Sequence, residues 1–210
     1  MKASWTVEEI SGGRMTVEIR QHGDWQEYRR FSFHADGVTK TAVEVYLGLL
    51  LDHIAYVREA GQRLGVELIQ LRIHDSSKFG LEEFPYYVRQ YHGDGGDPDG
   101  YAAAWLHHVH CNAHHWQHWI FPEAHTPRNS NVERGVVPMP LQYVQEMVAD
   151  WMGFGMAHHG TWDIGEWLHE TMPRIRVHSV TAVALRSLLD GLGYADVVHM
   201  QRFAHEVEAA

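Results

Sequence analysis

The hydrophobic period of the chain changes near residue 39, and this change constrains the fold more than any other feature. Before it, apolar and polar side chains alternate in the segments "TVEEI", "RMTVEIR" and "WQEYRRFSF", which are separated by the turn signals "SGG" and "QHGD". Alternation with a period of two predicts half-buried strands, and short turns between such segments predict an antiparallel meander. We therefore expect a small three-stranded sheet at the N-terminus.

After residue 39 the apolar residues recur at helical intervals. Thr41 and Glu44 have the spacing of a capping box and Gly65 offers a C-cap, so the residues between them predict one long amphipathic helix. Further helices are predicted over "VELIQLRIHDSSKF", "LEEFPYYVRQY", "GYAAAWLHH", "LQYVQEMVADWMGF", "IGEWLHE" and "SVTAVALRSLLDGL". Strands and helices do not alternate, so the predicted class is mainly α. Residues 1–38 are expected to form a β appendage and residues 39–210 one all-α domain.

Charge and cysteine content limit the partners and the compartment. Seventeen basic and 27 acidic side chains give a formal charge of -10, which repels a polyanion, so we expect no long nucleic acid as a partner. The longest apolar run, "VYLGLLL", is too short to cross a bilayer, and the N-terminus lacks a signal-peptide stretch. The lone Cys111 cannot form an internal disulfide and fits a reducing compartment. The expectation is a cytoplasmic protein without a membrane partner.

His74 and Asp75, in the stretch "RIHDSSKFG", are the first candidate metal ligands. On a helix their side chains diverge by about 100°, yet both can reach a cation that lies between two helices. Imidazole nitrogen and carboxylate oxygen suit Zn, Fe, Mn and similar ions. His53 borders the apolar face of the preceding helix, and a turn at Gly65 should bring it close to His74 as a third ligand.

Two later segments offer further ligands. The stretch "AWLHHVHCNAHHWQHW" holds six histidines from His107 to His118, which could be metal ligands or hydrogen-bonded surface and core groups. In "EMVADWMGF", Asp150 continues a helical stripe with Tyr143 and Met147, and a carboxylate on such a stripe needs a partner, which a metal would supply. Four more side chains could orient metal ligands or merely face water: Asn112, Glu82, Glu83 and Glu146.

In this order of residues the sequence resembles the HD superfamily of metal-dependent phosphohydrolases, all-helical proteins named for their His-Asp pair. "HDSSKFG" is similar to the His-Asp-x-x-Lys form of the subgroup that hydrolyses cyclic dinucleotides. "HHWQHWIFP" looks like the His-His segment of that subgroup, and "MPLQYVQEMVADW" looks like the segment that ends in its last metal-binding Asp. The resemblance covers residues 39–155. More closely, "HDSSKF", "EEF", "AWLHHVHCNAHHW" and "EMVADW" resemble a small uncharacterised family common in bacteria and phages.

The resemblance implies an HD-like helical bundle with one or two divalent transition metals, Mn, Fe or Zn. The implied ligands are His53, His74, Asp75, His108, His114, His115 and Asp150. The single histidine of the family pattern could be His107, His108 or His110. His108 continues the helical face of Tyr101 and Trp105 and is preferred, with His110 close behind. The other, glycine-rich signature of the subgroup is missing, so hydrolysis of cyclic dinucleotides is not implied.

The first function that this pattern predicts is hydrolysis of a nucleotide or another small phosphoester by metal-activated water. Two cations that share the Asp75 carboxylate would activate the water and clamp the phosphoryl group. Lys78 would neutralise a phosphate oxygen, although it could instead be a solvated helix residue. Asp75 and Lys78 are thus the predicted catalytic residues, and Arg174 and Arg176 are weaker candidates for binding the phosphate.

Two other functions fit the same residues. Some HD-superfamily members are di-iron oxygenases with the same order of ligands, and a histidine-rich site could prefer iron. A non-catalytic module stabilised by a metal is the third alternative, and it predicts that metal removal unfolds the chain. The N-terminal β element could cover the site or mediate a homodimer.

Overall fold

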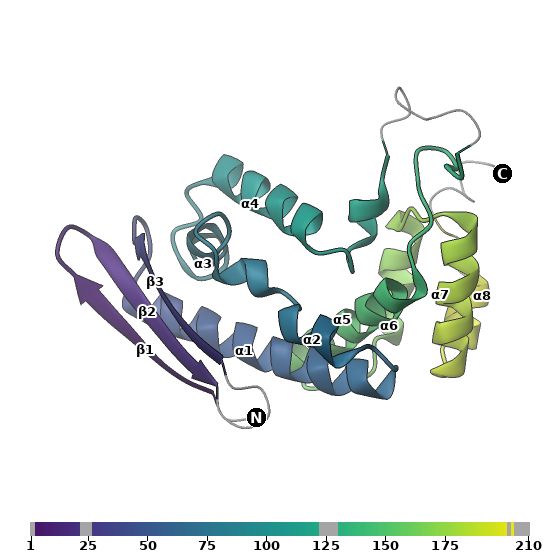
Figure 1. The fold of residues 1–210 in the computed structure, drawn as a ribbon, viewed down its shortest axis with the longest axis horizontal. Helices are drawn as coiled ribbons and strands as arrows, with labels where there is room; N and C mark the ends of the chain where they lie inside the picture. The colour runs from purple at the N-terminus through teal and green to yellow at the C-terminus, as the bar shows by residue number, and fades with distance from the viewer. Residues whose placement is uncertain (1–2, 22–26, 122–129, 201–202, 204–210) are drawn as a thin grey trace. The chain divides into compact units, whose positions relative to one another are not determined.

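The computed structural model describes residues 3–21, 27–121, 130–200 and 203 (Figure 1). The chain divides into two compact units, one made of residues 1–55 and 72–111 and the other of residues 56–71 and 112–210. The described residues are mainly helical and carry a small N-terminal antiparallel sheet, as the change of hydrophobic period predicts. No helix in this part of the chain combines the length and the hydropathy needed to span a membrane.

The first unit begins with the predicted meander. Strands β1 (Ala3–Ile10), β2 (Arg14–Gln21) and β3 (Glu27–His34) pair antiparallel in the order β1-β2-β3. Val17 in the central strand lies opposite Val7 on one side and Phe31 on the other. The tight β1–β2 turn contains Gly12 and Gly13, both with positive φ, a conformation that glycine adopts without steric cost. Residues 25–26, which begin the third predicted strand, lie outside the described residues.

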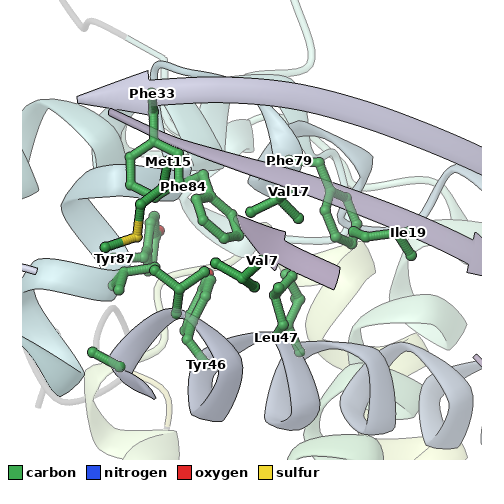
Figure 2. Close-up of a cluster of buried hydrophobic side chains, with 14 of the residues drawn as sticks. Val7, Met15, Val17, Ile19, Phe33, Tyr46, Leu47, Phe79, Phe84 and Tyr87 are labelled. Carbon is green, nitrogen blue, oxygen red and sulfur yellow. The ribbon is translucent and has the colours of Figure 1, made fainter. Parts of the chain in front are cut away.

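One face of the sheet packs on helix α1 (Lys40–Arg63) within the first unit. Met15, Val17 and Ile19 alternate along β2, so their side chains lie on the same face, and they are buried in one core with Tyr46 and Leu47 of α1 (Figure 2). The fully buried ring of Phe84 makes edge contacts with Phe33 and Tyr46, at centroid distances of 5.3 and 5.4 Å. The sheet and the helices of this unit therefore share a single hydrophobic core. The predicted domain boundary after residue 38 stays a prediction.

The remaining helices longer than six residues follow the predicted helical segments, whereas the shorter ones after residue 111 are not predicted. The first unit also contains the 3-10 turn η1 (Ser76–Phe79) and the helices α3 (Phe84–His92) and α4 (Pro98–Cys111). The second unit contains η2 (Trp116–Trp119), α5 (Leu141–His159), α6 (Gly165–Thr171), η4 (Met172–Arg174), α7 (Ser179–Gly191) and α8 (Ala195–Met200). Within that unit α5 packs against α7, and α7 against α8.

The long helix α1 differs from its prediction at the start. The helix begins at Lys40, and the hydroxyl of Thr39 accepts a hydrogen bond from the backbone N–H of Ala42 at 3.2 Å. Thr39 is therefore the capping residue, and the predicted cap at Thr41 is wrong. The predicted end is confirmed, because α1 stops at Arg63 and Gly65 takes a φ of 80°.

Candidate metal centre

Asp75 lies in a turn that the sequence pattern predicts as helix. Helix α2 (Leu68–Ile73) ends one residue before His74, and His74 and Asp75 form the turn that leads into η1. Asp75 has φ 55° and ψ 17°, in the left-handed region. That conformation costs an ordinary L-residue about 1–2 kcal/mol, and aspartate is one of the few residues that adopt it. The predicted continuous helix is wrong here, because Asp75 turns the chain between α2 and η1.

Three imidazole rings of the first unit surround the Asp75 carboxylate, which is fully buried. Its Oδ2 atom lies 3.3 Å from His53 Nε2 and 3.7 Å from His74 Nε2. Its Oδ1 atom lies 3.5 Å from His108 Nε2. Helix α1, the turn after α2, and helix α4 supply the three histidines. We call these four residues the Asp75 cluster. The two oxygens of one carboxylate therefore face different imidazoles.

The donor atoms of the Asp75 cluster fit a transition-metal ion. One ring nitrogen each of His53 and His74 and one oxygen of Asp75 lie within 4.8 Å of one another. Two ligand atoms about 2.1 Å from the same ion, at octahedral or tetrahedral angles, are about 3.0–3.4 Å apart. The observed nitrogen–oxygen separations are close to that range. Because imidazole and carboxylate together suit Zn, Fe and Mn, the cluster could hold a metal ion.

Electrostatics favour the metal-binding protonation states of two members of the cluster. Burial alone raises the pKa of the Asp75 carboxyl, but the neighbouring Lys78, His74 and His108 outweigh it and hold that pKa well below its usual range. Burial lowers the pKa of His108, and Lys78 acts in the same direction. A carboxylate and a neutral imidazole are the forms that bind metal ions.

Lys78 contacts the Asp75 cluster directly. Its Nζ atom lies 2.8 Å from Asp75 Oδ2, the same oxygen that faces His53 and His74. The side chain is only 18% exposed, and the ammonium group lies 5.8 Å from the centroid of the Tyr87 ring. Lys78 is therefore a largely buried ion-pair partner of the cluster in this structure. Its contact with a phosphate stays a prediction.

The structure distinguishes among His107, His108 and His110, the three candidates for the single histidine of the family pattern. His108 is fully buried and lies beside Asp75. His107 is partly exposed and directs its Nδ1 atom to Glu83, while His110 is exposed. His108 is thus the member of the three that belongs to the Asp75 cluster.

Glu83, one of the side chains that the sequence suggests could orient a metal ligand, is a buried carboxylate. Its Oε2 atom lies 2.8 Å from His108 Nδ1, and its Oε1 atom lies 2.7 Å from His107 Nδ1. Burial raises the pKa of Glu83, but its hydrogen bonds with His108, Ser77 and His107 outweigh that effect and lower it overall. The neighbouring Glu82 is exposed. The sequence names both glutamates as possible orienting groups, and the structure distinguishes Glu83 from Glu82 by its burial.

The second unit carries its own group of possible ligands. His114 is buried, its Nδ1 atom lies 3.4 Å from Glu146 Oε1, and its ring centroid lies 4.3 Å from that of His115. Glu146 is buried on α5 and accepts a hydrogen bond from the side-chain amide of Gln70. We call His114, His115 and Glu146 the His114 cluster. Imidazole and carboxylate are the ligand types that suit Zn, Fe and Mn.

The other predicted site residues of the second unit have different surroundings. Asp150 is half-buried on α5, one turn after Glu146, so the two carboxylates share a face of the helix. Arg174 is exposed at the end of η4. Arg176 donates a hydrogen bond to the backbone carbonyl of Arg134. The role of Asp150 as a ligand and of the two arginines as phosphate-binding groups stays a prediction.

Comparison with known families assigns the chain to one of them. A family model matches residues 43–190, which is more than half of the 210 residues and includes every predicted metal ligand. The chain belongs to the DUF5662 family. That family is described as a family of unknown function, so membership in DUF5662 assigns no activity. No curated protein matches the chain, and no solved structure does. The resemblance to the HD superfamily stays a prediction from the sequence.

Proposed function

We propose that this DUF5662 protein is a metal-dependent phosphohydrolase that acts on a nucleotide or another small phosphoester. The observation that carries the proposal is the buried Asp75 carboxylate, with His53 and His74 beside one oxygen and His108 beside the other. A carboxylate in such surroundings can bridge two cations, as in two-metal hydrolases. The order of ligands along the sequence, which resembles that of the HD superfamily, supports the same reaction.

The residues have distinct roles in this proposal. His53 and His74 would hold one ion together with Asp75 Oδ2, and His108 would hold a second together with Asp75 Oδ1. The sequence pattern assigns the further ligand positions to His114, His115 and Asp150. Divalent ions bound by such groups lower the pKa of a water molecule and offset the charge that develops on a phosphoryl oxygen.

Lys78 is the residue of the first unit that would contact the substrate. Its ammonium group neutralises Asp75 Oδ2 in this structure. When a cation neutralises that oxygen instead, Lys78 can bind a phosphate oxygen by a charge-assisted hydrogen bond. Its position beside the face of the Tyr87 ring limits the directions in which the side chain can extend.

The first test is metal content. Protein purified without a histidine tag is reconstituted with Mn, Fe and Zn, and its metal is counted by plasma mass spectrometry beside Asp75→Ala and His114→Ala variants. We expect transition metal in the native protein and a loss in both variants. Asp52→Ala is the matched control, because it removes an exposed aspartate that directly precedes His53 on α1. A native protein that binds none of the three metals contradicts the proposal.

The second test is turnover. The metal-loaded protein is assayed for phosphate release from nucleoside mono-, di- and triphosphates and for hydrolysis of cyclic nucleotides. We expect activity in at least one class, and a loss of at least tenfold in Lys78→Ala without loss of metal, because one charge-assisted contact to the transition state is removed. Inactivity across all classes contradicts the proposal. Iron with substrate-dependent oxygen uptake would support the oxygenase alternative, and metal binding without turnover would support the metal-stabilised module.

A further inference from the structure

Glu83 joins a buried histidine of the Asp75 cluster to a partly exposed histidine of the same unit. Its carboxylate is fully buried, and each oxygen contacts one imidazole, with 2.8 Å to His108 Nδ1 and 2.7 Å to His107 Nδ1. Glu83 occupies the N-cap position of α3, but its side chain makes no capping hydrogen bond. Stabilising the start of this helix therefore does not explain why the carboxylate is buried where it is.

The contact with Glu83 determines which nitrogen of His108 can serve as a metal ligand. An ionised carboxylate only accepts hydrogen bonds, so His108 donates from Nδ1. In a neutral imidazole the other nitrogen, Nε2, then keeps its lone pair. Nε2 is the atom that lies 3.5 Å from Asp75 Oδ1. The two contacts act on opposite edges of one ring, so they also restrict its rotation.

We propose that Glu83 is a positioning residue that holds His108 in the Nδ1–H tautomer and in the orientation that presents Nε2 as a metal ligand. This inference rests on the proposed metal site. A metal-ligating histidine commonly donates its other N–H to a carboxylate, and loss of that partner typically costs 10–100-fold in metal affinity. His107 contacts the second oxygen of Glu83 and so restrains the orientation of the carboxylate.

The test compares Glu83→Ala with Glu82→Ala, which removes the same charge from the adjacent exposed position. The tautomer of His108 is measured in the metal-free proteins by long-range ¹H–¹⁵N NMR, and the affinity for Zn²⁺ by competition with a chromophoric chelator. We expect the Nδ1–H form in the native protein and in Glu82→Ala. In Glu83→Ala we expect a shift towards the Nε2–H form and a 10–100-fold weaker affinity for Zn²⁺.

Glu83→Gln keeps the experiment interpretable if the alanine variant does not fold. The glutamine side chain has nearly the same volume but only one acceptor oxygen, so it can serve one imidazole at a time. We expect an intermediate loss of affinity and a mixture of tautomers. In His107→Gln the hydrogen bond to His108 remains, so we expect a smaller loss of affinity than in Glu83→Ala.

The two measurements separate failure of this inference from failure of the proposed function. An unchanged tautomer and an unchanged Zn²⁺ affinity in Glu83→Ala would overturn the role of Glu83 while leaving the metal site standing. A native protein that binds no Zn²⁺, Mn²⁺ or Fe²⁺ would overturn the proposed function. If the native protein binds no metal but the tautomer of His108 still changes in Glu83→Ala, the result supports the role of Glu83 in positioning the His108 ring.

Discussion

Asp75 combines a buried carboxylate with a backbone conformation that few residues adopt. Its left-handed φ of 55° lets the chain turn between α2 and η1, and its two oxygens face the imidazoles of the cluster. The backbone and the side chain make separate demands on this position. Asparagine meets the first demand, because it also tolerates the left-handed region, but it lacks the negative charge. Alanine meets neither.

Two substitutions of Asp75 should therefore separate its structural and chemical roles. We expect both Asp75→Asn and Asp75→Ala to lose bound metal, because a neutral side chain is a poor partner for a divalent cation. In the metal-free state we expect Asp75→Ala to be less stable than Asp75→Asn by about 1 kcal/mol or more, the cost of the left-handed conformation. Urea unfolding followed by circular dichroism measures this difference. Equal stabilities of the two variants would contradict the assigned backbone role.

The sequence predicts the candidate ligands better than the groups that support them. His53, His74, Asp75 and His108 can be selected because imidazole and carboxylate have the chemistry that metals require. For the supporting role the sequence offers Glu83 and Glu82 equally. Glu83 faces the core and Glu82 faces the solvent. At the start of a helix, a single sequence does not show which of two adjacent residues faces the core.

Glu146 illustrates the same limit in the second unit. The helical stripe of α5 points to Asp150 as the carboxylate that needs a partner, yet Glu146, one turn earlier, is the buried one and lies beside His114. Both positions share one helix face, so the periodicity of the sequence cannot rank them. The ranking depends on the packing around α5.

At the scale of elements, the second unit depends on a close approach of helix α5 to residues 56–63 of α1, which belong to the same unit. A Cβ atom at Gly153 would lie 2.5 Å from Val57 Cγ2 and 2.8 Å from the backbone nitrogen of Val57. The side-chain atom could move, but the backbone atom of a packed helix cannot move without shifting the helix. The two helices are therefore so close at this point that only glycine fits at position 153.

We predict that Gly153→Ala destabilises the protein. Overpacking of this kind costs about 1–3 kcal/mol, and it outweighs the gain of about 1 kcal/mol that alanine brings to a helix. Gly191→Ala in α7 is the matched control, because a Cβ there meets no atom within 4 Å. We expect the control to be neutral or slightly stabilising in urea unfolding. A Gly153→Ala variant as stable as Gly191→Ala would contradict the close approach.

The order and type of the strands and of the longer helices could be predicted because the hydrophobic period differs between strands and helices. The three strands and the long helix α1 follow their patterns closely. The end of α2 could not be predicted, because the residues "HDSSKF" permit either a continuing helix or a turn. The start of α1 could not be predicted to the residue either, because Thr39 and Thr41 are both suitable caps and lie two positions apart.

At the scale of the whole molecule, each compact unit brings imidazole and carboxylate side chains together. The Asp75 cluster belongs to the first unit and the His114 cluster to the second. All these residues lie within the 43–190 segment that matches the DUF5662 model. Metal binding is therefore expected to stabilise the native chain as a whole, since only the folded units assemble the ligands.

Metal removal should lower the thermal stability of the protein by an amount that grows with the logarithm of the ratio of free metal concentration to Kd. At a free metal concentration of about 100 times Kd, binding contributes about 2.7 kcal/mol to the native state. For a chain of this length we expect a fall in Tm of about 5–11 °C when a chelator removes the metal. Differential scanning calorimetry measures the change, and Asp75→Asn should show a much smaller shift because it lacks the shared ligand. Asp52→Ala should behave like the native protein. The same Tm with and without metal would contradict a site built from these residues, whereas complete unfolding on chelation would favour a structural role for the metal.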